Sequence, residues 1–361
     1  MRLRSFLLFV GLILLILSGE TDAEEPSWNF TTESCVSTVA ISDDGEYIVN
    51  SSWHGDNRTY LFHKDNNTPL WNHTAEEDVV SVAISEDGEH LVTGSWKDIY
   101  FFNKNSSSPL WNYTLDESIV VSVDISANGE HIAVGIASIS QEWWNYGNLT
   151  DGRVLLFRKE AVVSAENRVS SDWGLTNTFQ AGYGPVTCVA ISTDGQYVAY
   201  GIRSKGNSNV DDRRAILKFV DTSEQDSMEL QQGDWEHRID GSDWFSNVDD
   251  IAISSDSEYV AFAADGKIFL FHKRGCKPEP EEHWCAEGSE MGALWIYNRS
   301  VKSVSISADG EYIVAGSKFP DTDGLYLFHK DSSTPLWSYE TGDSIRTIAI
   351  SADGGYIAAG T

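Results

Sequence analysis

Cysteine is scarce in this chain, with four residues among 361. That number is too small for a disulfide scaffold, which small cysteine-dense secreted domains use in place of a large core. The chain also lacks a Gly-x-Ser-x-Gly elbow, a phosphate-binding loop and a His-Glu-x-x-His metal motif. These absences remove the usual signatures of a serine hydrolase, a nucleotide-binding enzyme and a zinc protease. The sequence therefore predicts no catalytic constellation.

Positive charge is also in short supply. The chain has 25 lysines and arginines against 55 acidic residues, which gives a net charge of −30. Such a surface repels polyanions, so the composition argues against nucleic acid and against strong binding to anionic membranes. Because the acidic residues are spread over the whole chain, most of them are expected to form a solvated surface.

No apolar run is long enough for a comfortable membrane span. The longest covers residues 6–17, follows Arg2 and Arg4, and leads into a polar stretch that ends at Ala23. A span needs about 20 apolar residues, whereas this arrangement is typical of a secretory signal peptide. The sequence predicts a signal peptide over residues 1–23, with an uncleaved signal anchor as the alternative, and one domain over residues 24–361. The protein is expected to be secreted or held at the cell surface, on the outer side of the cytoplasmic membrane.

The most prominent feature of the chain is one repeated sequence motif, Ser-Val-Ala-Ile-Ser-x-Asp-Gly-Glu. Its successive copies are 41 to 66 residues apart, and their isoleucines are Ile41, Ile84, Ile125, Ile191, Ile253, Ile306 and Ile350. A period near forty with variable loops indicates an array of one supersecondary unit.

The sixth copy shows the unit clearly. Residues 301–307 and 311–317 are apolar runs on either side of Asp309-Gly310, a strong hairpin signal. Residues 324–330 predict a third strand and residues 335–339 a fourth. Four short antiparallel strands in about forty residues are typical of a propeller blade.

The pattern resembles the WD-repeat propellers and the quinoprotein-like (PQQ-like) propellers. The Val-Ala-Ile-Ser-x-Asp-Gly core is similar to the first hairpin of a WD repeat, and Pro-Leu-Trp-x-Tyr is similar to the tryptophan strand of quinoprotein-like blades. The chain lacks the Gly-His and Trp-Asp dipeptides of the first family and the regular docking motif of the second. The resemblance covers nearly all of residues 28–361 and implies a β-propeller.

The repeat predicts an all-β, seven-bladed propeller of four-stranded antiparallel blades. Six copies are complete, and the seventh copy contains only its first two strands. Residues 26–30 resemble an orphan fourth strand. We therefore expect an incomplete last blade that is closed by the N-terminal strand, and a sequence that is truncated at its C-terminus.

The histidines and the acidic turn residues follow the repeat instead of converging on one site. His63, His272 and His329 share one repeat position, so they are expected to be spread around the ring. The Asp-Gly pairs are expected to be turns, with the turn at Asp256-Ser257 the most strained because it lacks glycine. Residues 321–324 resemble the start of a calcium loop without its glutamate. We predict no cofactor, with calcium at this turn as the less favoured alternative.

Cysteines and asparagines give two further predictions. Cys276 and Cys285 bracket a polar insert and are expected to form a disulfide, whereas Cys35 and Cys188 are left unassigned. Nine Asn-x-Ser/Thr sequons are candidate glycosylation sites, with an unmodified polar edge as the alternative: Asn29, Asn50, Asn57, Asn66, Asn72, Asn105, Asn112, Asn148 and Asn298.

Large aromatic residues interrupt the repeat in loops of one face. Loops on a rigid scaffold are where binding residues concentrate, and Trp and Tyr are favoured interface anchors. Local packing of the loops is the competing interpretation. The candidate binding residues are Trp53, Trp96, Trp143, Trp144, Tyr146, Tyr183, Trp244 and Phe245.

The sequence thus predicts a non-enzymatic, monomeric propeller that binds a protein or glycan partner. A quinoprotein-like dehydrogenase or other propeller enzyme, and a subunit of a cell-envelope assembly complex, are the alternatives, because propellers host all three.

Overall fold

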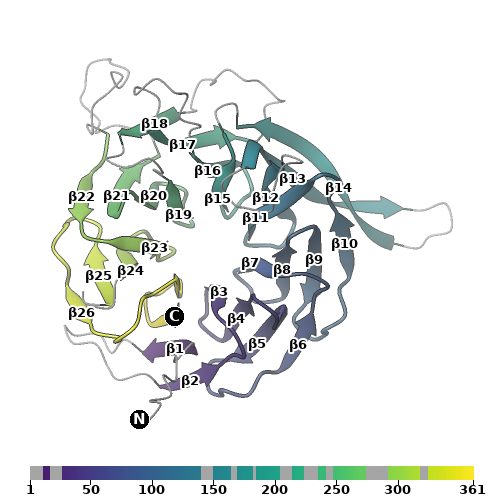
Figure 1. Cartoon of the computed structure of the whole chain (residues 1–361), viewed down its shortest axis with the longest axis horizontal. Coiled ribbons are helices and arrows are strands. Elements are labelled where there is room, and N and C mark those ends of the chain that lie inside the picture. Colours follow the sequence, from purple (N-terminus) through teal and green to yellow (C-terminus); the bar gives the residue numbers. More distant parts are fainter. Residues whose placement is uncertain are drawn as a thin grey trace, which may run out of the picture.

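The chain folds into a ring of four-stranded antiparallel sheets around a central axis (Figure 1). The computed structural model describes residues 11–16, 27–139, 149–163, 169–181, 184–203, 214–222, 235–240, 247–273, 292–317 and 324–361. Within these residues every regular element is a β-strand. The prediction of an all-β propeller with four-stranded antiparallel blades is confirmed.

Six blades are each made of four strands that are consecutive in the chain. The first three contain β3 (Val36–Ile41), β4 (Tyr47–Ser52), β5 (Arg58–His63) and β6 (Trp71–Thr74); β7 (Val79–Ile84), β8 (His90–Ser95), β9 (Asp98–Asn103) and β10 (Trp111–Thr114); and β11 (Ser118–Ile125), β12 (His131–Ile139), β13 (Leu149–Val163) and β14 (Val169–Gln180). The next three contain β15 (Val186–Ile191), β16 (Tyr197–Arg203), β17 (Arg214–Asp221) and β18 (Trp235–Asp240); β19 (Val248–Ile253), β20 (Tyr259–Ala264), β21 (Lys267–His272) and β22 (Trp295–Asn298); and β23 (Val301–Ile306), β24 (Tyr312–Ser317), β25 (Leu325–His329) and β26 (Trp337–Tyr339).

A further four-stranded sheet is composite, because it joins the two ends of the chain. Its strand order is β2-β1-β28-β27, with β1 (Gly11–Ile16), β2 (Trp28–Thr31), β27 (Thr347–Ile350) and β28 (Tyr356–Gly360). The N-terminal strand β2 is the outer strand, as predicted. The prediction that this sheet lacks its third strand is wrong, since β1 pairs antiparallel with both β2 and β28. Six continuous blades and this composite sheet thus stand where the sequence predicted seven blades with an incomplete last one.

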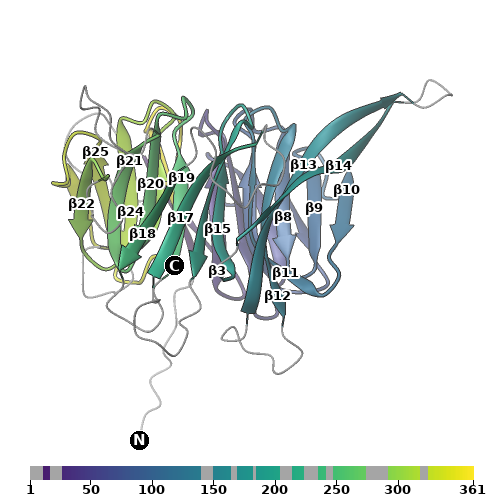
Figure 2. The same cartoon turned by 90° about the horizontal axis from the view of Figure 1, so that it is seen from above.

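The first strands of the sheets form the inner wall of the ring. Each inner strand contacts the next one around the axis, and β27 contacts β3. Figure 2 shows the sheets side by side, with the long β13–β14 hairpin of the third blade reaching beyond the ring. The inner strands and their hairpins therefore define two ends of the axis, one at the start of the inner strands and one at the hairpin turns.

Each inner hairpin is fixed by the same three positions of the repeat, which are Ser, Asp and Gly in most copies, with Asn128 in place of the aspartate in the third blade. In the first blade, Ser42 Oγ donates to Asp44 Oδ1 at 2.6 Å, and the backbone N–H groups of Glu46 and Tyr47 donate to Asp44 Oδ1 and Ser42 Oγ at 2.9 and 3.0 Å. The glycine that follows Asp44 has a φ of 69°. The repeated Asp-Gly pairs are turns, as the sequence predicted.

Ser257 replaces glycine in the hairpin of the fifth blade. It has a φ of 59° and is 5 % exposed, and its N–H donates to Ser254 O at 2.8 Å as the glycine N–H does in the other hairpins. A side chain in the left-handed region is strained because its Cβ crowds the backbone. This agrees with the expectation that this turn carries the most strain.

Replacing Ser257 with glycine is therefore expected to stabilise the protein by about 1 kcal/mol, because the left-handed penalty disappears while the turn keeps its hydrogen bonds. Urea denaturation of Ser257→Gly beside the wild type measures this difference. A variant that is less stable than the wild type would show that the serine side chain makes a contact worth more than the strain.

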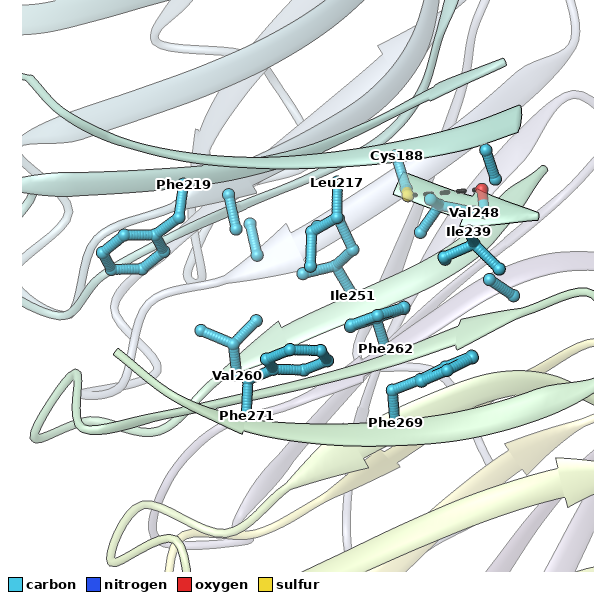
Figure 3. Packing of buried hydrophobic residues seen from close by; sticks show 14 residues of the cluster. Cys188, Leu217, Phe219, Ile239, Val248, Ile251, Val260, Phe262, Phe269 and Phe271 are labelled. Carbon is cyan, nitrogen blue, oxygen red and sulfur yellow. Dashed lines mark hydrogen bonds between the residues drawn. The ribbon is translucent and has the colours of Figure 1, made fainter. Parts of the chain in front are cut away.

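The blades pack face to face through large apolar side chains. Between the fourth and fifth blades, Leu217 and Phe219 of β17 face Phe262, Phe269 and Phe271 of β20 and β21 (Figure 3). The rings of Phe262 and Phe269 stack with centroids 4.7 Å apart. Burying one such ring stabilises a fold by about 2–3 kcal/mol, so these seams supply much of the stability.

The tryptophans of the outer strands fasten neighbouring sheets. Trp71 Nε1 of the first blade donates to the backbone oxygen of Lys104 in the second blade at 2.6 Å, and Trp295 Nε1 of the fifth blade donates to Lys330 O in the sixth at 2.6 Å. Trp28 of the composite sheet makes the same bond to Lys64 O of the first blade at 2.5 Å. These tryptophans are structural, because each one closes a seam between sheets.

Candidate functional site

Two of the predicted binding aromatics lie in the described part of the chain, Trp53 and Trp96. They hold the same place in successive blades: Trp53 N donates to Cys35 O at 3.3 Å, and Trp96 N donates to Asp78 O at 3.2 Å. Both are half-buried at the end where the inner strands begin. The other predicted aromatics lie outside the described residues: Trp143, Trp144, Tyr146, Tyr183, Trp244 and Phe245.

Residues 53–57 connect β4 to β5 and are called the rim loop below. Its backbone enters the left-handed region three times, at His54 (φ 58°), Gly55 (φ 103°) and Asn57 (φ 52°). Non-glycine residues there cost about 1–3 kcal/mol each and persist only where the surroundings impose them. Strain of this kind concentrates at functional sites, so the rim loop is the first candidate for binding.

Two carboxylates hold the rim loop in place. Asp56 is 5 % exposed and accepts hydrogen bonds from Ser52 Oγ and, at 3.0 Å, from the Tyr60 hydroxyl. Arg58 Nε lies 3.5 Å from Asp56 Oδ1. Burial raises the pKa of Tyr60, and the hydrogen bond to Asp56 adds to that rise, so Tyr60 stays a donor.

The second carboxylate belongs to the next blade. Asp78 Oδ1 accepts the His54 backbone N–H at 2.9 Å, which latches the loop onto the second blade. The imidazole of His54 stacks on Trp53 with ring centroids 4.2 Å apart, and the His54 side chain is 63 % exposed. Trp53 Nε1 is buried without a hydrogen-bond partner among the described residues. The rim loop is thus a rigid platform that presents one aromatic stack to solvent.

The repeat did not point to two acids of the inner strands, Asp124 and Asp250. Asp124 stands where most copies have alanine, and Asp250 stands where Ser81, Ser122 and Ser303 stand in other copies. Comparing the copies column by column would have found both. In each of the six continuous blades the inner strand has a β-bulge near its start. The bulge comes immediately before the repeat position that Asp250 occupies in the fifth blade. Bulges re-aim side chains, and here they direct them at the next blade.

Both acids hydrogen-bond the backbone of the following blade. Asp124 Oδ2 accepts Ile191 N at 2.8 Å, and Asp250 Oδ2 accepts Val304 N at 3.0 Å and Ser303 Oγ at 2.6 Å. Burial raises the pKa of Asp124 to about 7 and that of Asp250 to about 6, against their hydrogen bonds to backbone N–H groups, which lower it. The charge of Asp250 also raises the pKa of Asp124. These acids join blades and titrate near neutrality.

The histidines are distributed around the ring, as the sequence predicted. Nε2 of His63, His272 and His329 lies 3.0 Å from a glutamate of the same blade in each case. The His90 ring stacks on Phe101 with centroids 5.2 Å apart, and burial lowers the pKa of both His90 and His131. Among the described residues no group of three or more His, Cys, Asp or Glu side chains could hold a metal ion. The turn that resembles a calcium loop begins at residues 321–323, which lie outside the described part.

Cysteines and sequons are only partly described. Cys35 is half-buried and free, and Cys188 is buried and free, whereas Cys276 and Cys285 lie outside the described residues. Asn50 is 0 % exposed, so the folded protein cannot present it to a glycan, and Asn57 is half-buried. Asn148 lies outside the described residues. The exposed sequon asparagines are Asn29, Asn66, Asn72, Asn105, Asn112 and Asn298. No helix in the described ranges is long and apolar enough to cross a membrane.

One stretch of the chain matches a known protein family. Residues 67–103 match the family model described as WD domain, G-beta repeat. This stretch contains β6 and the first three strands of the second blade, so the matching unit begins with the outer strand of the preceding blade. A search of curated proteins gave no match. The match and the fold together support a WD-repeat propeller.

Proposed function

We propose that this WD-repeat propeller is a binding scaffold that takes a protein partner on the face of the rim loop. The observation that carries the proposal is the Trp53–His54 stack, which is exposed at His54 and held by the buried Asp56 and by Asp78 of the next blade. A preorganised aromatic anchor binds with little loss of conformational entropy. WD-repeat propellers generally bind proteins, which favours a protein over the glycan that the sequence also allowed.

Binding is proposed to be the whole activity of the protein, at the cell surface or after secretion. The exposed sequon asparagines support export, and Asn29, Asn72 and Asn112 share one repeat position on the outer strands. The N-terminal apolar segment does not add to this support, because its residues 11–16 form β1 of the composite sheet. Glycans there would shield the outer edges of three neighbouring sheets and leave the rim loop open.

The variant His54→Asn tests the site. Asparagine tolerates a left-handed backbone, so the loop keeps its conformation while the stacked imidazole is lost. Partners captured on the wild-type chain from cells that produce it are expected to bind His54→Asn about tenfold more weakly or worse, as at an interface hot spot. Leu336→Asn is the matched control, because Leu336 is 47 % exposed on the sixth blade, away from the rim loop. Equal binding by the wild type and His54→Asn, with equal stability, would remove this site.

A further inference from the structure

In each inner hairpin one residue directly follows the serine. Together these residues form a ring at the hairpin end of the axis, opposite the rim loop. This turn ring consists of Asp43, Glu86, Ala127, Thr193, Ser255, Ala308 and Ala352. Backbone hydrogen bonds join most of the neighbouring members from one blade to the next: Asp43 N donates to Glu86 O at 3.1 Å, Ala127 N to Thr193 O at 3.1 Å, and Ala352 N to Asp43 O at 3.0 Å. The turn ring therefore links the hairpin end of neighbouring blades, including the seam at the composite sheet.

The Glu86 side chain crosses the turn ring. Its Oε1 accepts Thr193 Oγ1 at 2.6 Å and Ser255 Oγ at 2.9 Å. Glu86 belongs to the second blade, whereas Thr193 and Ser255 belong to the fourth and fifth blades on the other side of the axis (Figure 1). A glutamate side chain is only a few bonds long, so this single carboxylate spans the hairpin end of the axis.

Asp43 is the neighbour of Glu86 in the turn ring. Burial raises the pKa of Asp43 to about 7, and the charge of Glu86, a side-chain hydrogen bond with Glu86 and the charge of Asp44 raise it further. Two carboxyl groups in contact share one proton, because the pair cannot ionise fully without repulsion. At lower pH the Asp43 carboxyl donates to the Glu86 carboxylate, and at higher pH its proton passes to solvent and leaves two negative charges.

The other groups near the pair do not relieve that repulsion. The remaining members of the turn ring carry no charge. The hairpin acids one residue further on are engaged in their own turns, where each accepts the hydroxyl of its own serine: Asp44, Asp87, Asp194, Asp256, Asp309 and Asp353. Within the described ranges, the charged groups that shift the pKa of Asp43 are Glu86 and Asp44, and both are acidic.

We propose that Asp43 and Glu86 form a pH-dependent closure of the hairpin end of the axis. While Asp43 holds its proton, Glu86 stays on Thr193 and Ser255 and braces the second blade against the fourth and fifth. When Asp43 loses the proton, the repulsion draws Glu86 away from the two hydroxyls and the turn ring loosens. This device is independent of partner binding at the rim loop, which lies at the opposite end of the inner strands.

Amide hydrogen exchange of the full chain at pH 6 and pH 8, corrected for intrinsic exchange rates, tests the proposal. The backbone amides of Asp43, Ala127 and Ser255 report on turns that carry Glu86 or one of its two hydroxyl partners, because they donate to Glu86 O, Thr193 O and Ala308 O. The amide of Ala308 donates to Ala352 O and serves as the internal control. Between pH 6 and pH 8 we expect the amide exchange rate at the three turns to increase about tenfold more than the rate at Ala308. A tenfold change in the opening equilibrium corresponds to a shift of about one pKa unit in the group that controls it.

Two variants separate this device from a general response to pH. Asp43→Asn keeps a neutral donor beside Glu86 and is expected to abolish the selective rise. In Glu86→Gln the pair cannot carry two negative charges, so this variant is also expected to abolish the selective rise in exchange. An equal rise in the wild type and in Asp43→Asn, or an equal rise at all turns including that of Ala308, would overturn the proposal.

Discussion

Lowering the pH from about 8 to about 5 is expected to stabilise the folded protein. Burial raises the pKa of Asp124 to about 7 and that of Asp250 to about 6, against 3.8 in the absence of the fold. The folded state therefore binds protons more tightly than the unfolded state. At 1.36 kcal/mol per unit of pKa difference, the two groups together add about 4 kcal/mol over this interval.

The sign follows from proton linkage. A group whose pKa is raised by folding contributes its full stabilisation below its unfolded pKa, and loses it as the pH rises through the folded pKa. For Asp250 and Asp124 that loss runs through about pH 6 and pH 7. Asp43 acts in the same direction, since its pKa is also raised to about 7.

The free energy of unfolding from urea titrations at several pH values measures this effect. The control is the double variant Asp124→Asn and Asp250→Asn, which retains almost all of the net charge of −30 and hence its general repulsion. The double variant is expected to lose most of the pH dependence. If its pH dependence matches that of the wild type, the response comes from surface charge and not from the inner strands.

The repeat predicted most of the fold because each copy carries its own local signals. Asp44 and the glycine after it set the first hairpin, and the alternating apolar residues of the flanking strands bury both faces of a blade. The outer-strand tryptophans recur for the same reason: Trp71 and Trp295 close equivalent seams. Such features depend on neighbours in the sequence or one repeat away, so a period reveals them.

The features that the sequence did not predict depend on the ring as a whole. Glu86 meets Ser255 at a separation of 169 residues, and only the radius of the turn ring makes that contact possible. The third strand of the composite sheet was missed because a short apolar run fits a buried strand and the apolar part of a signal peptide equally well. Of the candidate binding aromatics, the structure shows Trp53 stacked on His54. The His54 backbone N–H donates to Asp78 of the next blade, and no repeat position predicted that contact.

Alanine at Gly45 is expected to destabilise the protein by a few kcal/mol. Gly45 has a φ of 69°, and a Cβ there would lie 2.5 Å from Cδ2 of Tyr356 on β28. The left-handed backbone alone costs about 1–2 kcal/mol for alanine, and forcing a methyl group into a filled contact adds about 1–3 kcal/mol. The clash falls on the seam between the first blade and the composite sheet, so the effect reports on how firmly that sheet is docked.

Two matched glycines make this measurement decisive. Gly342 has a φ of 75° with nothing within 4 Å of an added Cβ, so Gly342→Ala measures the backbone cost alone. Gly310 has a φ of 71° and the same 2.5 Å approach to Tyr259, at a seam between two continuous blades. If the composite sheet docks as a true blade, urea denaturation will show Gly45→Ala to be as harmful as Gly310→Ala. If Gly45→Ala instead matches Gly342→Ala, Tyr356 yields to the methyl group, and the ring is held by its six continuous blades without a firm seal at the composite sheet.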